Sequence, residues 1–434
     1  FEYGISIRHF VQSRNQRCTA GTDCNERRRG TGKKLNEYLV NWAHKGGYDV
    51  DTFLIESECP RFSSGDGKGL IKSTVRGKDL FIIIDVGNYN VKYQMYDQQN
   101  AMSPDDHYQD LKRIIQAASG KAHRINVIMP ILYGGRQHRR NYRESLDCAC
   151  ALQELYQMGV SNILTVDAHD PRVHNAIPLM GFDNMMPSYQ VLKAMFQTIP
   201  HLKTTPDEFM VISPDEGALN RNMYYASMLG VPMGMFYKRR DYSKIINGHN
   251  PIVAHEYLGN SVEGKDVFIA DDIISSGESM LDIAYALKER KARRVFCYAT
   301  YGLFVNGLEK FDKANEDGYI DAVFSTNLTY RTDELLKREW FHEVDCSKYI
   351  SYFIASLNHD VPSAMSLTRT QRSRHCWIGE TRKTHKRTVK RCTYMRKSCC
   401  TVCQCGSFSD AVRIFSKKQL TNDPIFAILI EMLI

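Results

Sequence analysis

Short apolar runs alternate with amphipathic segments along most of the chain, from about Leu35 to Asn358. The run Leu80–Val86 (LFIIIDV) has the apolar, β-branched character of a buried strand, and Pro104–Ser119 spaces its apolar residues as one face of a helix. A helix that crosses between two strands allows them to run parallel in one sheet. The alternation therefore predicts stacked βαβ units with mostly parallel sheets, and it excludes a collagen, a coiled coil and a fully disordered chain.

The predicted elements form two successive series of similar rhythm. The first has strands over Leu80–Val86, Ile125–Pro130 and Asn162–Asp167, and helices over Pro104–Ser119 and Tyr142–Met158. The second has strands over Phe209–Ser213, Val231–Phe236, Val267–Asp272, Arg294–Thr300 and, as its last, Ala322–Ser325, with helices over Glu216–Leu229 and Gly277–Arg290. Pro200 and a polar stretch interrupt the pattern over Ser188–Lys203. We expect one domain over 35–190 and another over 191–360, with an irregular segment over 1–34 and a tail over 361–434.

The positive net charge of the chain, +8, comes from its two ends. Residues 366–434 hold 14 Lys and Arg against 4 Asp and Glu, and residues 1–34 hold 8 against 3. The body over 35–365 holds 35 basic against 42 acidic residues and is acidic. A protein that docks on a phosphate backbone usually carries basic surface on its folded body, so we expect no nucleic-acid partner.

The two ends also differ from the body in composition. Over Thr368–Lys397 there is almost no apolar spacing, so this segment cannot bury enough surface to offset its ordering entropy. The tail cysteines lack the two separated pairs of a zinc site: Cys376, Cys392, Cys399, Cys400, Cys403 and Cys405. A zinc knuckle and a basic nucleic-acid arm are the alternatives to the interpretation that we favour, aberrant sequence from a frame shift or read-through. Residues 1–30 raise the same suspicion.

Signals for the compartment point to the cytoplasm. No apolar run reaches the length of a membrane span, and the closing stretch PIFAILIEMLI is too short. The cysteines of the body show no disulfide-like pairing: Cys59, Cys148, Cys150, Cys297 and Cys346. We therefore expect a cytoplasmic protein with no membrane partner.

The strongest chemical signal is Val267–Ser279 (VFIADDIISSGES), in which a strand runs into two adjacent carboxylates. Asp271 and Asp272 can accept hydrogen bonds from two neighbouring sugar hydroxyls or bind Mg²⁺ through water. The small residues that follow allow backbone N–H groups to surround a phosphate at a helix N-terminus. Together these parts describe a ribose 5-phosphate cradle. The alternative is an ordinary strand-to-helix connection with Asp as the N-cap.

Four further motifs bring polar groups that suit a phosphate, a nucleotide or a metal ion. They are Tyr133–Arg140 (YGGRQHRR), Val166–Pro171 (VDAHDP), Ile212–Arg221 (ISPDEGALNR) and Phe236–Asp241 (FYKRRD). Each lies at or after the end of a predicted strand, where parallel sheets bind their ligands.

In the first two of these motifs, three side chains suit a nucleotide. Arg136 can grip a phosphate or stack on a purine, and Gln137 can hydrogen-bond adenine or ribose. His169, at the tip of a strand, suits a metal ion or a phosphate. An exposed basic helix cap and a structural histidine are the plain alternatives.

The other two motifs suit a transferring phosphoryl group. Asp215 can hold Mg²⁺ while backbone amides near Gly217 meet a pyrophosphate. Lys238 and Arg240 lie two positions apart on extended backbone, so they point the same way and can flank the group in transfer. A solvated charged loop is the alternative for this last pair.

In their order along the chain, these motifs resemble the type I phosphoribosyltransferase fold and the ribose-phosphate pyrophosphokinase family. The resemblance covers roughly Phe53 to Asp360, about 70% of the chain. It implies an α/β protein of two tandem phosphoribosyltransferase-like domains, each a mostly parallel sheet flanked by helices. It also implies an enzyme that transfers the β,γ-diphosphoryl group of ATP to O1 of ribose 5-phosphate, giving 5-phospho-ribose 1-diphosphate and AMP.

The resemblance assigns roles to the motif residues. The ATP site would comprise Phe62, Asp66, Arg136, Gln137 and His169. The ribose 5-phosphate site would comprise Asp271, Asp272, Ser275, Ser276, Gly277, Glu278 and Ser279. Lys238 and Arg240 would be catalytic, and His169 and Asp215 would bind Mg²⁺, the expected cofactor. Phe62 and Asp66, in Pro60–Lys68, would reach the ATP site of a neighbouring subunit, so we expect a homo-oligomer.

Three positions depart from the family pattern. His138 stands where the family more often has Asp, Glu278 stands where many relatives have Gly, and Glu216-Gly217-Ala218 retains one of two usual glycines.

Two other functions stay open. A plain phosphoribosyltransferase would use the same carboxylate pair but would need neither the Arg136-Gln137 pair nor a first βαβ domain. A catalytically silent regulatory paralogue would be expected to have lost Lys238, Arg240, His169 or Asp215, and all four are present.

Overall fold

The computed structural model describes residues 10–13, 31–240 and 252–360. At 10–13, 31, 238–240 and 252–255 only the backbone is described. The expectations for most of residues 1–30 and for the tail over 361–434, including its cysteines, lie outside this part of the chain.

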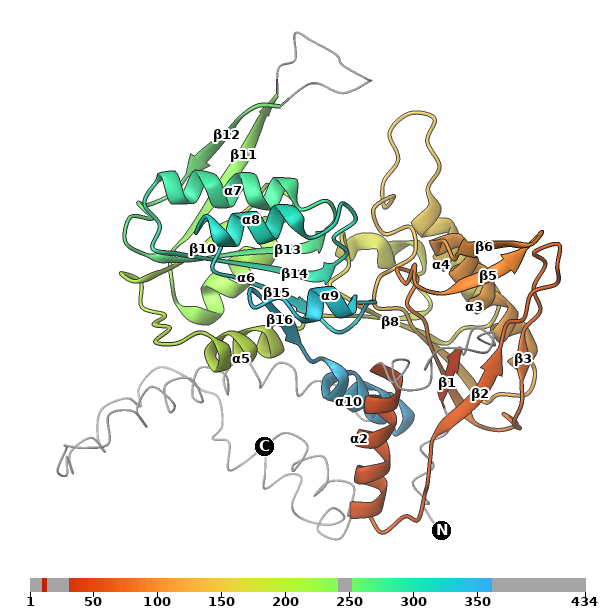
Figure 1. Ribbon diagram of the computed structural model, residues 1–434. Coiled ribbons are helices and arrows are strands. Elements are labelled where there is room, and N and C mark those ends of the chain that lie inside the picture. Colours follow the sequence, from red (N-terminus) through yellow and green to blue (C-terminus); the bar gives the residue numbers. More distant parts are fainter. Residues whose placement is uncertain (1–9, 14–30, 241–251, 361–434) are drawn as a thin grey trace, which may run out of the picture.

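The first sheet has the strand order β3-β2-β1-β4-β7-β8-β9 (Figure 1). Its strands are β1 (Phe10–Ser13), β2 (Leu54–Glu58), β3 (Leu70–Ile71), β4 (Asp79–Ile83), β7 (Arg124–Ile128), β8 (Asn162–Val166) and β9 (Gly181–Met185). All neighbours pair in parallel except β3, which lies antiparallel to β2 at one edge. A separate hairpin, β5 (Lys92–Met95) with β6 (Gln98–Ala101), follows β4.

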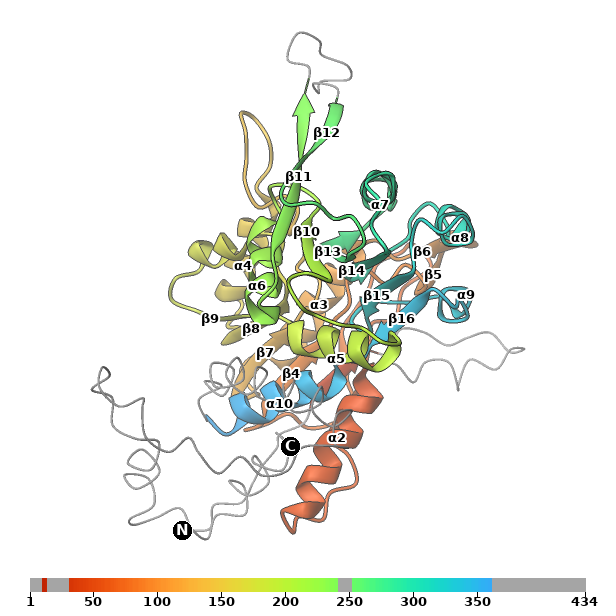
Figure 2. The same ribbon diagram turned by 90° about the vertical axis from the view of Figure 1, so that its left-hand side faces the viewer.

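The second sheet repeats this plan with the order β12-β11-β10-β13-β14-β15-β16. Its strands are β10 (Phe209–Ser213), β11 (Met233–Arg240), β12 (Ile252–Leu258), β13 (Asp266–Ile274), β14 (Arg294–Gly302), β15 (Ala322–Thr326) and β16 (Phe341–Val344). Its one antiparallel neighbour is again at an edge, β12 against β11. These two strands extend away from the body as an arm (Figures 1 and 2). The predicted pair of mostly parallel sheets is confirmed.

Helices cover both faces of the sheets. They are α2 (Thr31–Lys45), α3 (Pro104–Ala118), α4 (Asp147–Gln157), α5 (Ser188–Thr198), α6 (Leu219–Leu229), α7 (Glu278–Glu289), α8 (Glu309–Glu316), α9 (Asp333–Leu336) and α10 (Ser347–Asn358), with a 3₁₀ turn η1 (Pro171–Ala176). The start of α3 shows why local sequence sets its bounds. Ser103 and Asp106 form a reciprocal capping box, and Pro104 occupies the first turn, where its missing N–H is not needed.

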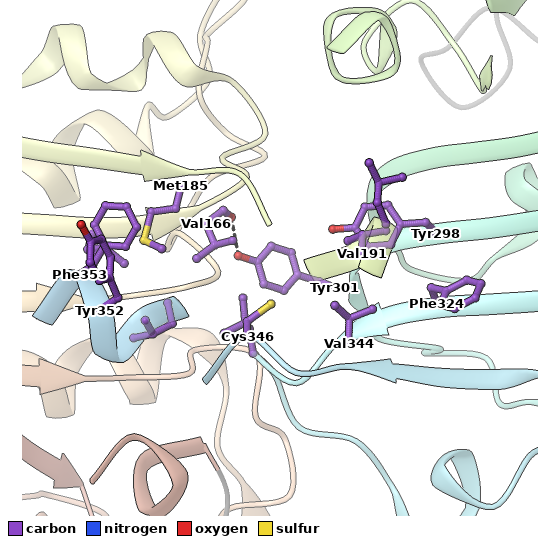
Figure 3. Packing of buried hydrophobic residues seen from close by; sticks show 14 of the residues in the cluster. Val166, Met185, Val191, Tyr298, Tyr301, Phe324, Val344, Cys346, Tyr352 and Phe353 are labelled. Carbon is purple, nitrogen blue, oxygen red and sulfur yellow. Dashed lines mark hydrogen bonds between the residues drawn. The ribbon is translucent and has the colours of Figure 1, made fainter. Parts of the chain in front are cut away.

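One apolar core runs through both halves of the molecule. It joins α2, α5, α6 and α10 to one face of each sheet, while the opposite faces have separate cores under α3 and α4 and under α7 and α8. Figure 3 shows Tyr301 of the second sheet inserted beside Val166 of the first. The buried Tyr301 hydroxyl lies 2.5 Å from the carbonyl oxygens of both Pro130 and Val166. The sheets are therefore joined by shared packing as well as by a linker.

The last helix returns to the first half of the chain. α10 packs against α2 (Figure 1), and the Ser351 hydroxyl lies 3.4 Å from the Leu35 carbonyl oxygen. Arg124 at the start of β7 forms an ion pair with Asp360 at 2.5 Å. Helices from both ends of the described chain thus form one layer.

Several expected elements are wrong in detail. The irregular segment over 1–34 contains β1, an inner strand, and the start of α2. The stretch over Ser188–Lys203 holds α5 instead of an interruption, because Val191, Leu192 and Met195 bury one face. β16 follows the strand expected to be last.

Two helices begin later than expected. The helix expected from Tyr142 starts at Asp147, since Tyr142 has a φ of 56°, outside the helical region. The helix expected from Glu216 starts at Leu219, where the Asp215 carboxylate accepts the Ala218 N–H just before the first turn.

Among the helices of the described ranges, none is long and apolar enough to cross a membrane.

Candidate active site

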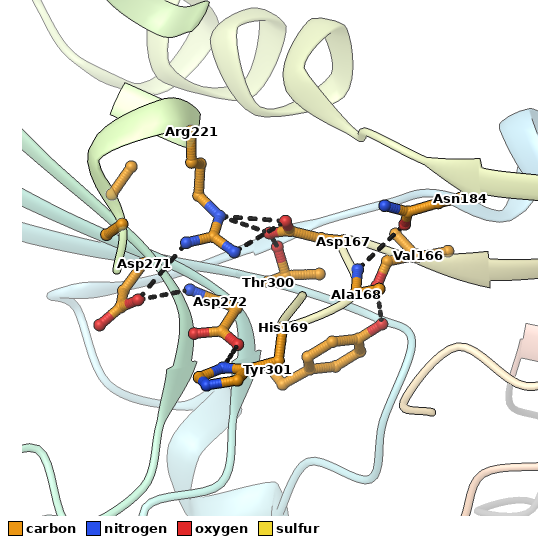
Figure 4. Close-up of polar contacts among 12 residues, drawn as sticks. Val166, Asp167, Ala168, His169, Asn184, Arg221, Asp271, Asp272, Thr300 and Tyr301 are labelled. Carbon is orange, nitrogen blue, oxygen red and sulfur yellow. Dashed lines mark hydrogen bonds and ion pairs between the residues drawn. The ribbon is translucent and has the colours of Figure 1, made fainter. Parts of the chain in front are cut away.

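The carboxylate pair lies near the end of β13, where it faces the tip of β8 in the first sheet (Figure 4). The Asp272 carboxylate is nearly buried, and its Oδ2 lies 2.6 Å from His169 Nδ1. The Asp272 backbone N–H donates to Asp271 Oδ1 at 2.8 Å. The structure therefore brings together His169, Asp271 and Asp272, which the sequence analysis had assigned to two different substrates.

A buried ion pair lies beside this contact. Arg221 of α6 donates from Nε to both carboxylate oxygens of Asp167, at 3.0 and 2.9 Å, and its Nη1 lies 3.6 Å from Asp271 Oδ1. Asp167 follows β8 with a φ of 50°, and its backbone N–H donates to the Met185 carbonyl. Thr300 of β14 donates its hydroxyl to Asp167 at 2.5 Å. Three segments of the second half thus converge on residues 167–169 of the first.

Sequence reasoning quoted Arg221 and Asp167 within their motifs but gave neither a role. The signal available was their position, because each lies in a motif beside an assigned residue. Nothing local marks Thr300 or Tyr301, which are buried polar residues in an otherwise apolar strand.

The cluster shifts the pKa values of its two adjacent carboxyl groups in opposite directions. Burial, then repulsion from Asp272, raises the pKa of Asp271. Burial also opposes ionisation of Asp272, but the His169 hydrogen bond and the nearby Arg221 charge hold its pKa well below its ordinary range. The hydrogen bond to Asp272 raises the pKa of His169, and burial raises that of Asp167 against the opposing pull of Arg221. Asp272 is therefore the member of the adjacent pair that is held ionised.

The loop after β13 approaches helix α8 closely. Gly277 has a φ of 84°, and a Cβ there would lie 2.3 Å from Phe311 Cε2, so both backbone shape and space call for glycine. The Ser275 carbonyl accepts the Val305 N–H at 2.9 Å. The Glu278 side chain is exposed and pairs with Lys310 of α8 at 2.5 Å. Glu278 thus turns its charge toward α8, while Ser279 is exposed in the first turn of α7.

In the segment after β7, His138 lies beside His169 of the cluster. The ring of His138 lies 5.3 Å from that of His169 between centroids, and its Nε2 is 3.5 Å from Asp170 Oδ2. Arg136 is exposed, while the Gln137 amide donates to the Ser145 carbonyl at 2.8 Å. The position that departs from the family pattern is therefore the one that contacts His169.

The other assigned residues lie on other elements of the fold. Asp215 lies in the turn before α6, and its carboxylate accepts the Ala218 N–H at 3.1 Å. Phe62 is 56% exposed in a tight turn after β2, where its N–H donates to the Asp66 carbonyl at 2.7 Å. Lys238 and Arg240 are on β11 in the arm, and their side chains lie outside the described part of the structure.

Comparison with known proteins identifies both halves. The profile of the N-terminal domain of ribose phosphate pyrophosphokinase matches residues 33–159, and that of the phosphoribosyl transferase domain matches residues 184–328. Ribose-phosphate pyrophosphokinase of Thermosipho africanus is 28% identical over 64% of this chain and 82% of its own length. The Vibrio vulnificus enzyme of the same name is 30% identical over 63% of this chain and 79% of its own length.

A solved structure agrees in fold. Phosphoribosylpyrophosphate synthetase from Mycobacterium smegmatis superimposes with a TM-score of 0.59 at 18% identity, covering 81% of this chain and all of that one. The shared order of both domains and the level of identity lead to one conclusion: the chain belongs to the ribose-phosphate pyrophosphokinase family and is an enzyme of that class.

Proposed function

We propose that this enzyme transfers the β,γ-diphosphoryl group of ATP to O1 of ribose 5-phosphate at the junction of its two sheets. One observation carries the proposal. The carboxylate pair at the end of β13, suited to sugar hydroxyls, meets His169, suited to a nucleotide phosphate, at 2.6 Å. A reaction that joins a sugar to part of a nucleotide needs these two kinds of group at one place.

The sugar phosphate would bind to the second half. Asp271 and Asp272 accept hydrogen bonds from two ribose hydroxyls, and the ionised state of Asp272 strengthens its bond. The backbone of residues 275–279 surrounds the 5-phosphate at the N-terminus of α7, where the helix dipole favours an anion. Since the Glu278 carboxylate is paired with Lys310, that residue would contribute its backbone N–H.

The nucleotide would enter from the first half as its magnesium complex. Among the described residues, no three His, Cys, Asp or Glu side chains form a metal cluster. Mg²⁺ keeps most of its water and binds through one or two protein groups plus phosphates. His169 and Asp215 would contact the ion, and Arg136 and Gln137 the nucleotide. The Gln137 amide must then leave the Ser145 carbonyl.

The transfer itself would depend on positioning and charge. The ribose 1-hydroxyl attacks the β-phosphorus, the bond from the β-phosphorus to the bridging oxygen of AMP breaks, and AMP leaves. Lys238 and Arg240, on the arm, would close over the group in transfer and stabilise its charge. Lys238 and Arg240 occupy alternate positions of one strand, which supports a joint role.

The proposal extends to assembly and compartment. Phe62 is exposed in the turn after β2, which supports a role in the ATP site of a neighbouring subunit and hence a homo-oligomer. The described cysteines are free thiols, which supports a cytoplasmic location: Cys59, Cys148, Cys150, Cys297 and Cys346.

A coupled assay for AMP release tests the function. Mg-ATP is supplied with and without ribose 5-phosphate to the full chain and to a version that ends at Asp360. AMP that forms only with the sugar phosphate, from both proteins, supports the proposal and makes the tail dispensable. No AMP from either folded protein favours the silent regulatory paralogue.

The same assay tests the arm. The substitution K238A should lower turnover roughly 100-fold or more, the scale for a fixed charge that stabilises a transition state. K313A, at an exposed lysine of α8, serves as the control and should keep full turnover. Unchanged turnover in K238A would refute the role of Lys238.

A further inference from the structure

The guanidinium of Arg221 lies where the two sheets meet, and it contacts carboxylates of both. It bonds Asp167 of the first half through Nε and Nη2 at 2.9–3.0 Å, while its Nη1 is 3.6 Å from Asp271 of the second. Its side chain is only 9% exposed. A planar group with several fixed donors suits such a bridge, which a lysine could not reproduce.

Together with its neighbours, Arg221 completes a closed chain of contacts (Figure 4). Asp167 and His169, two residues apart after β8, each hold one member of the carboxylate pair. His169 holds Asp272 directly, and Asp167 holds Asp271 through Arg221. The Asp272 N–H bond to Asp271 joins the two ends. A shift of either carboxylate is therefore transmitted to the same three-residue segment of the first half.

Arg221 and Asp167 act through other residues. The Asp167 side chain is 3% exposed, and the Thr300 hydroxyl donates to it at 2.5 Å. Asp271, in contrast, is 27% exposed, and its distance from Arg221 is longer than a hydrogen bond. The buried Arg221–Asp167 ion pair is thus fixed in place, whereas the partly exposed Asp271 carboxylate can turn toward a ligand.

We infer that Arg221, anchored on Asp167, is a positioning residue that couples the two substrate sites, so that binding of ribose 5-phosphate alters the affinity for Mg-ATP and the reverse. This inference rests on the function proposed above. Sugar hydroxyls that engage Asp271 and Asp272 change what Arg221 and His169 contact. The segment that carries Asp167 and His169 then adjusts, and with it the nucleotide site. Such a coupling is reciprocal by thermodynamic necessity.

Binding measurements with an inert nucleotide test the inference. Calorimetry would give the affinity of the full chain for magnesium α,β-methylene-ATP, whose α–β bridge cannot be cleaved, with and without saturating ribose 5-phosphate. The reverse titration would give the same factor for the sugar. In the native protein we expect a factor of roughly 5 or more. In R221M/D167N we expect that factor to fall about threefold or more, because only one of the two connections from the carboxylate pair to residues 167–169 remains, the His169–Asp272 contact.

The double substitution avoids leaving one buried charge without its partner, which would threaten folding. R221K retains the charge but lacks the planar fork, and it should lose part of the coupling. R294M/D266N is the matched control, since it removes a buried ion pair at the opposite end of β13 and should keep the native factor. Thermal unfolding would confirm that each variant is folded.

The outcomes separate the two proposals. A native coupling factor in folded R221M/D167N would overturn the inference and leave the proposed function standing. The same would follow if the native protein bound the two ligands independently. Native protein that binds neither ligand would overturn both. If R221M/D167N fails to fold, R221K decides, and a native factor there would overturn the role of the guanidinium.

Discussion

The two halves of the molecule meet at two places. Each place joins strands that hold corresponding positions in the two sheets. β4 and β13 are the central strands of the two sheets, and β8 and β15 lie two strands further along each sheet. The tip of β13 faces the tip of β8 at the candidate active site. The tip of β4 likewise faces the tip of β15, where Asp85 accepts the Thr329 hydroxyl and the Tyr330 N–H. We call these the active junction and the closed junction.

The junctions share a backbone plan but differ in how their acids are satisfied. At the closed junction, Asp85 is a single carboxylate with three donors at 2.9–3.1 Å, the third being the Gly87 N–H. At the active junction, the adjacent Asp271 and Asp272 share fewer donors, and one of the pair is partly exposed. The fold thus supplies two places for an acid. Only the place with a second carboxylate, fewer donors and a partly exposed side chain is suited to a ligand.

The connections after the two strands differ as well. β13 leads through Ser275–Gly277 directly into α7, whereas β4 is separated from α3 by the hairpin β5–β6. A short turn into a helix places backbone N–H groups around an anion. The inserted hairpin removes that geometry from the first half.

Substitution of an acid at each junction should have the largest and most unequal effect. D272N removes the charge that His169 contacts and should lower kcat/KM for ribose 5-phosphate roughly 100-fold or more, the scale for loss of a charged hydrogen bond at a reacting centre. D85N should change it by less than about 3-fold, because the Asp85 carboxylate already accepts hydrogen bonds from three protein donors. Steady-state kinetics checks both, and equal losses in the two variants would contradict the distinction between the junctions.

Glycine substitutions compare the two connections. G277A forces alanine into a positive φ and against the buried Phe311 ring, so it should lower the free energy of unfolding by about 2–4 kcal/mol. G87A should lower it by less, about 1 kcal/mol, because Gly87 has no positive φ. Its two nearest neighbours, the end of the Ile131 side chain at 2.8 Å and Thr329 Oγ1 at 3.1 Å, are side-chain atoms that can move. Denaturant unfolding measures the difference. A G87A variant as unstable as G277A would show that the closed junction is packed just as tightly.

The pH dependence of the free energy of unfolding tests Asp85 at the closed junction. Burial raises the pKa of Asp85 to about 6, so the folded state binds its proton more tightly than the unfolded state does. The stability linked to this proton is fully present below the unfolded value near 4 and is lost as the pH rises through about 6. D85N should lack that loss, gaining about 2 kcal/mol relative to the native protein between pH 4.5 and 7.5. Parallel unfolding curves for the two proteins across this range would contradict the role of Asp85, and D317N, at an exposed carboxylate, is the control.

Much of the fold follows from local pattern. Fully apolar runs such as Phe209–Ser213 formed strands where periodicity predicted them, because burial on both faces leaves no other arrangement. β1 and α5 were missed for opposite reasons. β1 lies in a segment of unusual composition, and α5 has an apolar face that a nearby proline obscured. β1 is placed by its pairing with β2 and β4, and the apolar face of α5 is buried by neighbouring elements. Neither relation is visible in the segment itself.

Within the candidate site, the motifs singled out the candidate groups but not their connections. Asp271, Asp272 and His169 were assigned from residue type and from position at strand ends, since the carboxyl ends of parallel strands share one edge. That His169 contacts Asp272, 103 positions away, could not be predicted, because no local rule relates the edges of two different sheets. Arg221 was passed over for the same reason, as its partner Asp167 lies 54 residues earlier.

The sequence by itself determined the fold class, the family and the chemical groups available, because strand periodicity, turn residues and clustered polar side chains are local properties of the chain. Only the tertiary structure decided which groups each acid contacts where the two sheets meet. Asp85 and Asp272 both come at the ends of apolar strands, and both are largely removed from water. What separates them is the set of donors that the other half of the molecule brings to each, and those donors depend on how the two sheets pack.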